Sequence, residues 1–286
     1  MKESTLSGLT KTGMGKSSDH FTAPEISQDL KTASVQSDIF SLGCILHEMV
    51  GTEPRVPFRE IREAGEFSAV LLNCTRDDPS KRFASARAVL DAILSIDYEP
   101  QGTVSNTSVD YIAILSAGDL PDAGFWPRIA DFLANAAKEP DIAAICGKLS
   151  SDKIVALCEK DQASAKVVGL IFADWVKKTA FGFEQSDAIA NRLEAFIEKC
   201  DFETQVECLL SMLELGISHN RLFVERKFVR LCNATMDEGL AKRMVVQLHV
   251  IGKAVCQDFA QLERSISFNR DFYHPRIVKA LGDLCK

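Results

Sequence analysis

Apolar residues recur every three or four positions along most of this chain, and no other feature constrains its fold as strongly. Such spacing gathers apolar side chains on one face of an α-helix, whereas a half-buried β-strand needs strict alternation. The helical spacing is clearest from about Trp126 onward, and no part of the chain shows a convincing strand pattern. We therefore predict an all-α protein.

The segment from Val109 to the C-terminus is expected to be a series of helices with short breaks between them, for example at 147–148 and at Gly216. Short breaks favour antiparallel neighbouring helices. Successive pairs of this kind resemble an irregular solenoid of the HEAT or armadillo sort, although no repeat of fixed length is present, and an α-helical bundle is the alternative. Because such stacks commonly bind proteins, we expect a protein partner or substrate to use this helical tail. A packed domain without a ligand is the simpler interpretation.

The net charge limits the kinds of partner. The chain has 286 residues, enough for two ordinary domains, and a formal net charge of −7. This balance argues against nucleic acid or an anionic membrane as partner, because both attract clustered Lys and Arg. We interpret the densest basic cluster (Arg221, Arg226, Lys227 and Arg230) as one solvated helix face. No stretch approaches the ~18 uninterrupted apolar residues of a membrane-spanning helix.

The cysteine pattern favours reduced thiols. Nine cysteines are spread along the chain without a Cys-x-x-Cys pair, and several occupy apolar helical positions. An odd number in this arrangement favours buried thiols over disulfides or a zinc site. The first residues also lack the apolar core of a secretory signal. We therefore expect a cytoplasmic protein.

Composition divides the chain into four parts. Residues 1–20 are rich in Ser, Thr, Gly and Lys and are expected to form a flexible loop. Residues 21–96 contain apolar helical segments separated by Pro and Gly. The polar stretch 97–108 is typical of a linker, and 109–286 is the helical tail.

Four short motifs occur in order between residues 21 and 82. They are Phe21-Thr22-Ala23-Pro24-Glu25, Ser37-Asp38-Ile39-Phe40-Ser41-Leu42-Gly43, Pro57-Phe58, and Asp78-Pro79-Ser80-Lys81-Arg82. Together they resemble the C-terminal part of a serine/threonine protein kinase catalytic domain, from the Ala-Pro-Glu of the activation segment to the Asp-Pro-x-x-Arg before the last helix. The resemblance covers residues 5 to 95, about a third of the chain.

The resemblance implies roles for individual residues. Ser18 matches a position beside the substrate hydroxyl, and with Phe21 it would belong to the substrate platform. Structural roles fall on six motif residues: Ala23, Pro24, Glu25, Asp38, Gly43 and Arg82. Thr10 and Thr12 lie where kinases often carry an activation-loop phosphate, although an unregulated Ser/Thr-rich loop has the same composition.

The resemblance also predicts a buried ion pair between Glu25 and Arg82. The planar fork of an arginine suits this role because it can donate two hydrogen bonds to one carboxylate. Residues 39–50 are apolar on nearly every face, so we expect a helix that is buried all round, with Ser37 or Asp38 as its N-terminal cap. In kinases the residue matching Asp38 contacts the catalytic loop, but a simple helix cap is an equal alternative.

The residues that bind ATP in a kinase are missing from this sequence. It contains no Gly-rich phosphate loop followed by a strand Lys, no His-Arg-Asp loop and no Asp-Phe-Gly. The segment Gly13–Ser18 is not a phosphate-binding P-loop either, because Thr10 stands where its first Gly is required. We therefore expect no catalytic residue, metal or other cofactor in this chain, whereas a complete parent kinase would use ATP and Mg²⁺.

Two functional hypotheses remain open, and they leave it uncertain whether the protein is an enzyme. The first is a piece of a serine/threonine protein kinase whose remaining parts lie elsewhere. The second is a non-catalytic helical scaffold that keeps a kinase remnant and binds another protein.

Overall fold

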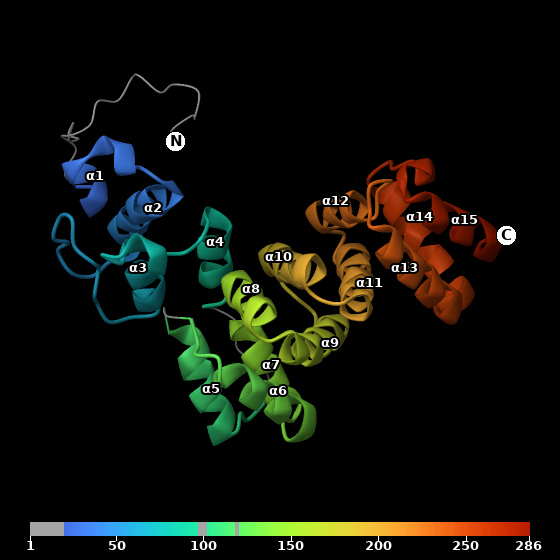
Figure 1. Ribbon diagram of the computed structural model, residues 1–286, viewed down its shortest axis with the longest axis horizontal. Helices are drawn as coiled ribbons and strands as arrows, with labels where there is room; N and C mark the ends of the chain where they lie inside the picture. The colour runs from blue at the N-terminus through green and yellow to red at the C-terminus, as the bar shows by residue number, and fades with distance from the viewer. Residues whose placement is uncertain (1–19, 97–101, 118–119) are drawn as a thin grey trace. The chain divides into compact units, whose positions relative to one another are not determined.

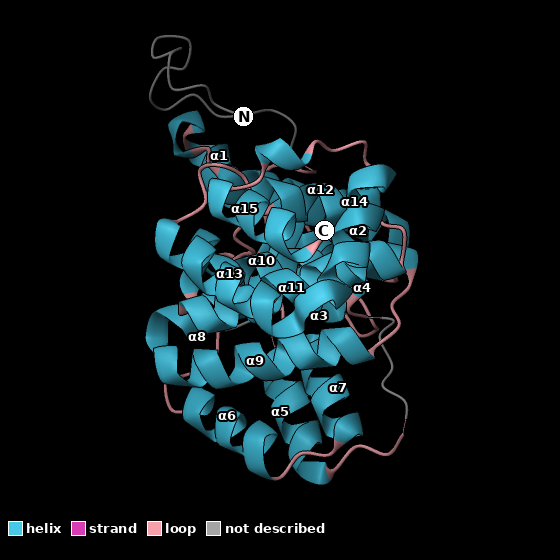
Figure 2. Ribbon diagram, turned by 90° about the vertical axis from the view of Figure 1, so that its right-hand side faces the viewer, coloured by secondary structure: helices cyan, strands magenta, loops and turns pink. Residues whose placement is uncertain are grey.

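The computed structural model describes residues 20–96, 102–117 and 120–286. Within these residues the protein is all-α, and the only extended pairing is one isolated antiparallel bridge between Asn233 and Tyr273 (Figure 2). No described helix has the length and apolar sequence that are needed to cross a lipid bilayer.

The chain forms two compact units. The first contains the described residues of 1–99 and 109–121, and the second contains those of 100–108 and 122–286. Each unit is described by itself below.

The first unit is built around α2, which lies beside α3 (Figure 1). Its core is formed by buried side chains from α2, α3 and α4 together with one residue of the preceding loop: Ile39, Val70, Cys74, Ala88, Val89 and Phe83. The helices are α1 (Pro24–Gln28), α2 (Val35–Val50), α3 (Ser68–Thr75) and α4 (Ala86–Leu94), with the 3₁₀ turns η1 (Leu30–Thr32) and η2 (Pro79–Lys81), and α5 (Asn106–Ser116) has residues in both units.

The second unit is centred on α11, which contacts α9, α10, α12, α13 and α14 (Figure 1). Its helices are α6 (Phe125–Asn135), α7 (Glu139–Lys148), α8 (Ser151–Lys160), α9 (Gln162–Lys178), α10 (Phe183–Lys199), α11 (Phe202–Ser218), α12 (Leu222–Leu231), α13 (Glu238–Ile251), α14 (Val255–Ser265) and α15 (Pro275–Leu284), with the 3₁₀ turns η3 (Gly252–Ala254) and η4 (Arg270–Phe272). The buried face of α11 includes Leu209, Met212 and Leu213, whose spacing is the helical pattern noted in the sequence.

Aspartates begin three of these helices. The carboxylates of Asp161, Asp201 and Asp237 each accept a hydrogen bond from a backbone N–H in the first turn of the helix that follows. A negative charge at this end also interacts favourably with the helix dipole. A single residue separates α8 from α9 and two separate α10 from α11, whereas six precede α13.

The end of the predicted linker is ordered. Residues 106–108 open α5, and Asp141 at the start of α7 holds this segment in place. Its Oδ1 accepts hydrogen bonds from Ser105 N at 2.8 Å and from Ser108 Oγ at 2.7 Å, and its Oδ2 accepts one from Lys138 N at 3.1 Å. The polar residues Ser105 and Ser108 therefore hydrogen-bond to Asp141 and do not form a flexible linker at this point.

The basic cluster of Arg221 and α12 is a solvated face only in part: Arg226 and Arg230 are exposed, whereas Lys227 is buried. Lys227 is buried and pairs with Glu194 of α10, and Arg230 binds the same carboxylate. Arg221 donates two hydrogen bonds to Asp187, at 2.7 and 2.6 Å. Buried charges need such partners, and the acids lie more than thirty residues away in the sequence, where helical periodicity does not locate them.

The prediction of reduced cysteines is wrong at one pair. Cys256 and Cys285 form a disulfide, whereas the remaining seven cysteines are free and buried. The two bonded residues are 29 positions apart, so sequence spacing gave no sign of their contact.

We predict that Asp141→Asn destabilises the second unit by about 1–3 kcal/mol, because the amide cannot accept all three hydrogen bonds. Burial raises the pKa of Asp141, but the hydrogen bonds from Ser105, Ser108 and Lys138 outweigh it and lower the pKa to about 2. A lowered pKa means that this stabilisation is complete above the ordinary carboxyl pKa and is lost as the pH falls toward 2.

Urea unfolding between pH 2 and 7, followed by the fluorescence of Trp126 in this unit, measures both effects. Asp131→Asn, on an exposed face of α6, is the matched control and should leave the stability within about 0.5 kcal/mol. Equal stability of Asp141→Asn and the parent at pH 7 would contradict the role given to Asp141.

Candidate functional site

The motif residues that the sequence analysis singled out meet in the first unit. Ala23 is extended, with φ −65° and ψ 144°, and Pro24 is the first residue of α1, a position that suits proline because its missing N–H is not needed there. Ala23 is fully buried against Phe40 and Cys44 of α2. The segment thereby fixes the start of α1 against α2 and directs the next residue, Glu25, inward.

Glu25 and Arg82 form the two-pronged ion pair that the sequence analysis predicted. Arg82 Nη1 lies 2.7 Å from Glu25 Oε1, and Arg82 Nη2 lies 2.9 Å from Glu25 Oε2. The Arg82 side chain is 0 % exposed and that of Glu25 is 18 % exposed. Two residues separated by 57 positions thus join α1 to the loop before α4.

The other N–H groups of Arg82 bind backbone carbonyls. Nε donates to Arg76 O at 2.7 Å, Nη1 also donates to Gln36 O at 3.0 Å, and Nη2 makes a longer contact of 3.5 Å with Asp77 O. The guanidinium also lies 4.9 Å from the centre of the Phe40 ring. All five donors are engaged, as a charge withdrawn from water requires.

Ser37 extends this network into the first turn of α2. Its hydroxyl donates to Glu25 Oε1 at 2.7 Å and accepts a hydrogen bond from Ser34 N at 3.2 Å. Burial raises the pKa of Glu25, but the hydrogen bonds from Arg82 and Ser37 outweigh it and leave the pKa below its ordinary value. Glu25 is therefore held as a carboxylate.

The cap of α2 differs from the sequence prediction. The helix begins at Val35 with Ser34 as its N-cap, and Ser37 is the third residue of the first turn, reaching back to the Ser34 backbone. Asp38 is exposed, and its carboxylate has no hydrogen-bond partner among the residues that the structure describes. It neither caps α2 nor joins the Glu25–Arg82 network.

Gly43 lets α2 and α3 approach closely. A Cβ atom added at Gly43 would lie 2.3 Å from Cys74 Cβ and 2.9 Å from Thr75 Cγ2. Contacts that short do not occur between real side chains, so a larger residue would force α3 away from α2. This accounts physically for the Gly at the end of the second motif.

One face of α2 is exposed, which corrects the expectation of burial all round. Val35, Ile45 and Met49 are 55 %, 50 % and 77 % exposed, and Val56 in the following loop is 63 % exposed. The described residues cover two adjoining sides of α2, one with Ile39 in the core and one with Phe40 and Cys44 against Ala23. The sequence shows that α2 is apolar on all sides, but it does not show whether other residues of this chain pack against every side.

Phe21 is anchored by a residue that the sequence analysis missed. The Phe21 ring is 38 % exposed, and its face lies 5.1 Å from the Arg55 guanidinium. Arg55 also donates to His20 O, and it pairs with Glu48 at 3.1 Å. Ser41 Oγ donates to Phe21 O at 2.7 Å. Because these partners come from outside the Phe21 motif, only the tertiary fold shows them.

The predicted sites at Thr10, Thr12 and Ser18 lie outside the described residues. Within the described residues, no group of three or more His, Cys, Asp or Glu is placed to hold a metal ion. The arrangement around Glu25 and Arg82 has its hydrogen bonds directed inward at protein groups. Its hydrogen bonds connect α1, the start of α2 and the loop before α4, so the network holds these segments together.

Comparison of the chain with protein-family models, with curated proteins and with solved structures found no match. The kinase-like interpretation therefore depends on the four motifs and on the contacts just described.

We predict that Arg82→Ala destabilises the first unit by about 3–5 kcal/mol, because it leaves Glu25 and several carbonyls without their buried partner. Arg82→Lys should destabilise the unit less, since lysine keeps the positive charge but cannot donate two parallel hydrogen bonds to the Glu25 carboxylate. Circular dichroism during urea unfolding measures the change, and the fluorescence of Trp126 and Trp175 follows the second unit as an internal reference.

Arg62→Ala is the matched control. The Arg62 side chain is 66 % exposed and pairs with Glu60 at the surface, so its removal should change the stability by less than about 1 kcal/mol. If Arg82→Ala and Arg62→Ala unfold at the same urea concentration, Arg82 does not hold this unit together.

Proposed function

We propose that this chain is part of a serine/threonine-protein-kinase-like protein, in which residues 21–96 form the C-terminal helical part of the catalytic domain. The observation that carries the proposal is the Glu25–Arg82 pair with Ser37 bound to the same carboxylate. Glu25, Ser37 and Arg82 come from three different sequence motifs. Motifs that matched by chance would have no reason to meet in one network.

The exposed face of α2 also supports the proposal. Ile45 and Met49 leave apolar surface in water, and apolar surface of this kind commonly marks a place where further protein binds. In a kinase-like protein the matching helix is surrounded by the rest of the domain. The proposal therefore assigns the cover of α2 to protein that is not among the described residues.

The proposal gives this chain a supporting role and not a catalytic one. Phosphoryl transfer needs ATP, a metal ion and cationic groups around the transferred phosphate, and the sequence contains none of the motifs that hold them. ATP and Mg²⁺ are cofactors of the complete kinase-like protein only. Within this chain, Phe21 and Ser18 would belong to the platform under a protein substrate.

The second candidate function is a protein-binding scaffold, and one observation in the second unit favours it. Val246, Val250 and Ile251 on α13 are 53 %, 73 % and 38 % exposed, and their spacing places them along one side of the helix. An irregular HEAT-like stack of helices would present such a surface to a protein partner. The two candidates are compatible if the helical unit recruits a substrate for the kinase-like domain.

We predict that the 286-residue chain neither binds Mg·ATP more tightly than about 1 mM nor transfers phosphate to a generic basic protein. Calorimetric titration and a radiolabelled-phosphate assay on purified protein measure this. Turnover that persists through stringent purification would show that an active site exists among residues assigned here to structure.

The nucleotide sequence upstream of the Met1 codon distinguishes the two candidate functions. Reading the transcript on the 5′ side of the Met1 codon should reveal in-frame Asp-Phe-Gly and His-Arg-Asp motifs if the kinase-like proposal is correct. An in-frame stop codon directly upstream in every transcript would contradict it and leave the scaffold.

A further inference from the structure

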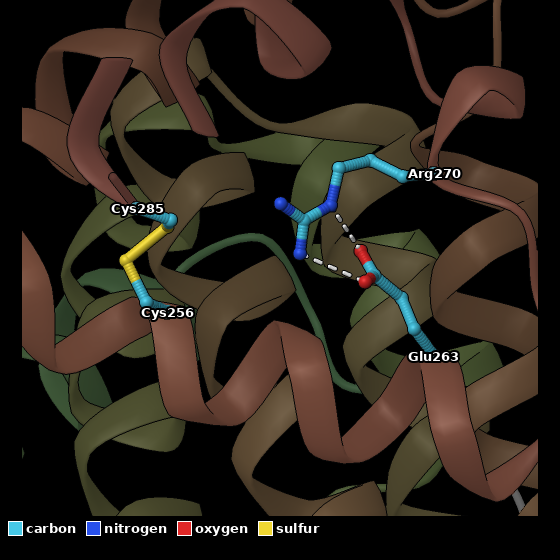
Figure 3. The surroundings of a disulfide bond; sticks show 4 residues. All are labelled: Cys256, Glu263, Arg270 and Cys285. Carbon is cyan, nitrogen blue, oxygen red and sulfur yellow. Dashed lines mark hydrogen bonds and ion pairs between the residues drawn. A yellow bond between two sulfur atoms is a disulfide. The ribbon is translucent and has the colours of Figure 1, made fainter. Parts of the chain in front are cut away.

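The only disulfide among the described residues ties the C-terminal helix to its neighbour. It joins Cys256, in the first turn of α14, to Cys285, the residue that follows α15 (Figure 3). The segment between them carries η4 and α15. Ile277, Ala280 and Leu281 bury one side of α15, which packs on α13, and the disulfide and a hydrogen bond from Cys285 N to Leu281 O close its C-terminal end.

Cys256 lines an open cavity of about 730 Å³ along α14. The other lining residues are Gln257, Ala260, Gln261, Glu263, Arg264 and Phe268. Cys285 is not among them, so a small molecule in the cavity meets the Cys256 sulfur first. The cavity is wide open to solvent, so a small thiol reaches its wall directly from outside.

The charged groups on the cavity wall favour an anion. Glu263 is occupied by Arg270, whose Nε and Nη2 lie 2.8 Å from its two carboxylate oxygens (Figure 3). Arg264 is exposed, and its Nε donates to Ala260 O of its own helix at 3.0 Å. The Glu263 charge is thus balanced, whereas the Arg264 charge is available to a carboxylate in the cavity.

We propose that this cavity is a thiol-exchange site, where a small carboxylate-bearing thiol opens and its disulfide form closes the Cys256–Cys285 bond. The thiolate attacks the Cys256 sulfur, the bond to Cys285 breaks, and Cys285 leaves as a thiolate that takes a proton from water. A second thiolate attacks the mixed disulfide on Cys256 and releases the small disulfide together with the Cys256 thiolate. Two small thiols are oxidised and one protein disulfide is reduced.

The remaining cysteines provide an internal comparison. All seven are buried, and the most exposed of them, Cys200, is only 8 % exposed. Cys158 and Cys200 lie with their sulfurs 3.4 Å apart, yet neither lines the cavity. Solvent access therefore distinguishes the bonded pair Cys256–Cys285 from the adjacent but unbonded Cys158 and Cys200, because exchange requires a thiolate to reach the sulfur.

The first test uses the unaltered protein. The folded chain, prepared without reductant, is treated with millimolar reduced glutathione, quenched with an alkylating reagent and mapped by mass spectrometry. Label should appear on Cys256 and Cys285 and be restored to disulfide by oxidised glutathione, while the other seven cysteines stay unlabelled. Reduction should lower the melting temperature of the second unit by about 5–10 °C, since the closed loop is released.

Several results would overturn the proposal. One is a disulfide that resists glutathione until the protein is unfolded in urea. Another is label that enters Cys158 or Cys200 as quickly as it enters Cys256 and Cys285. The third is failure of oxidised glutathione to close the bond. Each outcome would show that access through the cavity does not control exchange.

Single-cysteine variants test which sulfur is attacked. With oxidised glutathione, Cys285→Ser should form a mixed disulfide on Cys256 about tenfold faster than Cys256→Ser forms one on Cys285. Equal rates in the two folded variants, or a faster reaction at Cys285, would contradict attack from the cavity.

Charge selection is tested with Arg264→Gln. This change should slow exchange with glutathione about three- to tenfold and leave exchange with the cationic thiol cysteamine unchanged or faster. Arg128→Gln is the matched control, because Arg128 is also exposed and donates to its own helix, to Gly124 O at 3.0 Å. Equal effects of the two substitutions would show that Arg264 does not select the thiol.

Discussion

A guanidinium that is withdrawn from water needs a partner for each of its N–H groups, and Arg82 meets this requirement only when three other segments are in place. Its partners are the Glu25 carboxylate of α1 and the carbonyls of Gln36, Arg76 and Asp77. α1, the start of α2 and the loop after α3 must therefore assemble around one side chain. Because α1, α3 and α4 are short, a shared buried charge supplies specificity that apolar packing alone would not.

The second unit depends on a different constraint. α11 is surrounded by five helices, so its side chains must be apolar and closely fitted on most faces. The polar residues of this unit have specific structural roles. Aspartates cap the N-termini of helices, and the Glu194 carboxylate binds Lys227 and Arg230 of α12. Near the unit's C-terminus a covalent bond joins the end of α15 to α14.

Sequence reasoning succeeded where local pattern determines structure. The all-α class follows from local spacing, and the Glu25–Arg82 contact followed from the motif resemblance. It failed where the deciding partner is distant in the chain. Ser37 was expected to cap α2, but its hydroxyl binds Glu25, and the cap is Ser34. Likewise, neither the buried position of Lys227 nor the Cys256–Cys285 bond can be deduced from spacing, because each depends on a residue about thirty positions away.

The central claim is that Glu25 and Arg82 stabilise the first unit through each other and not separately. A double-mutant cycle with Glu25→Gln, Arg82→Met and the combined variant, measured by urea unfolding, tests it most directly. The account predicts a coupling free energy of at least about 2 kcal/mol, with the double variant losing much less than the sum of the single losses. A coupling below about 0.5 kcal/mol would contradict it, because the two residues would then act independently.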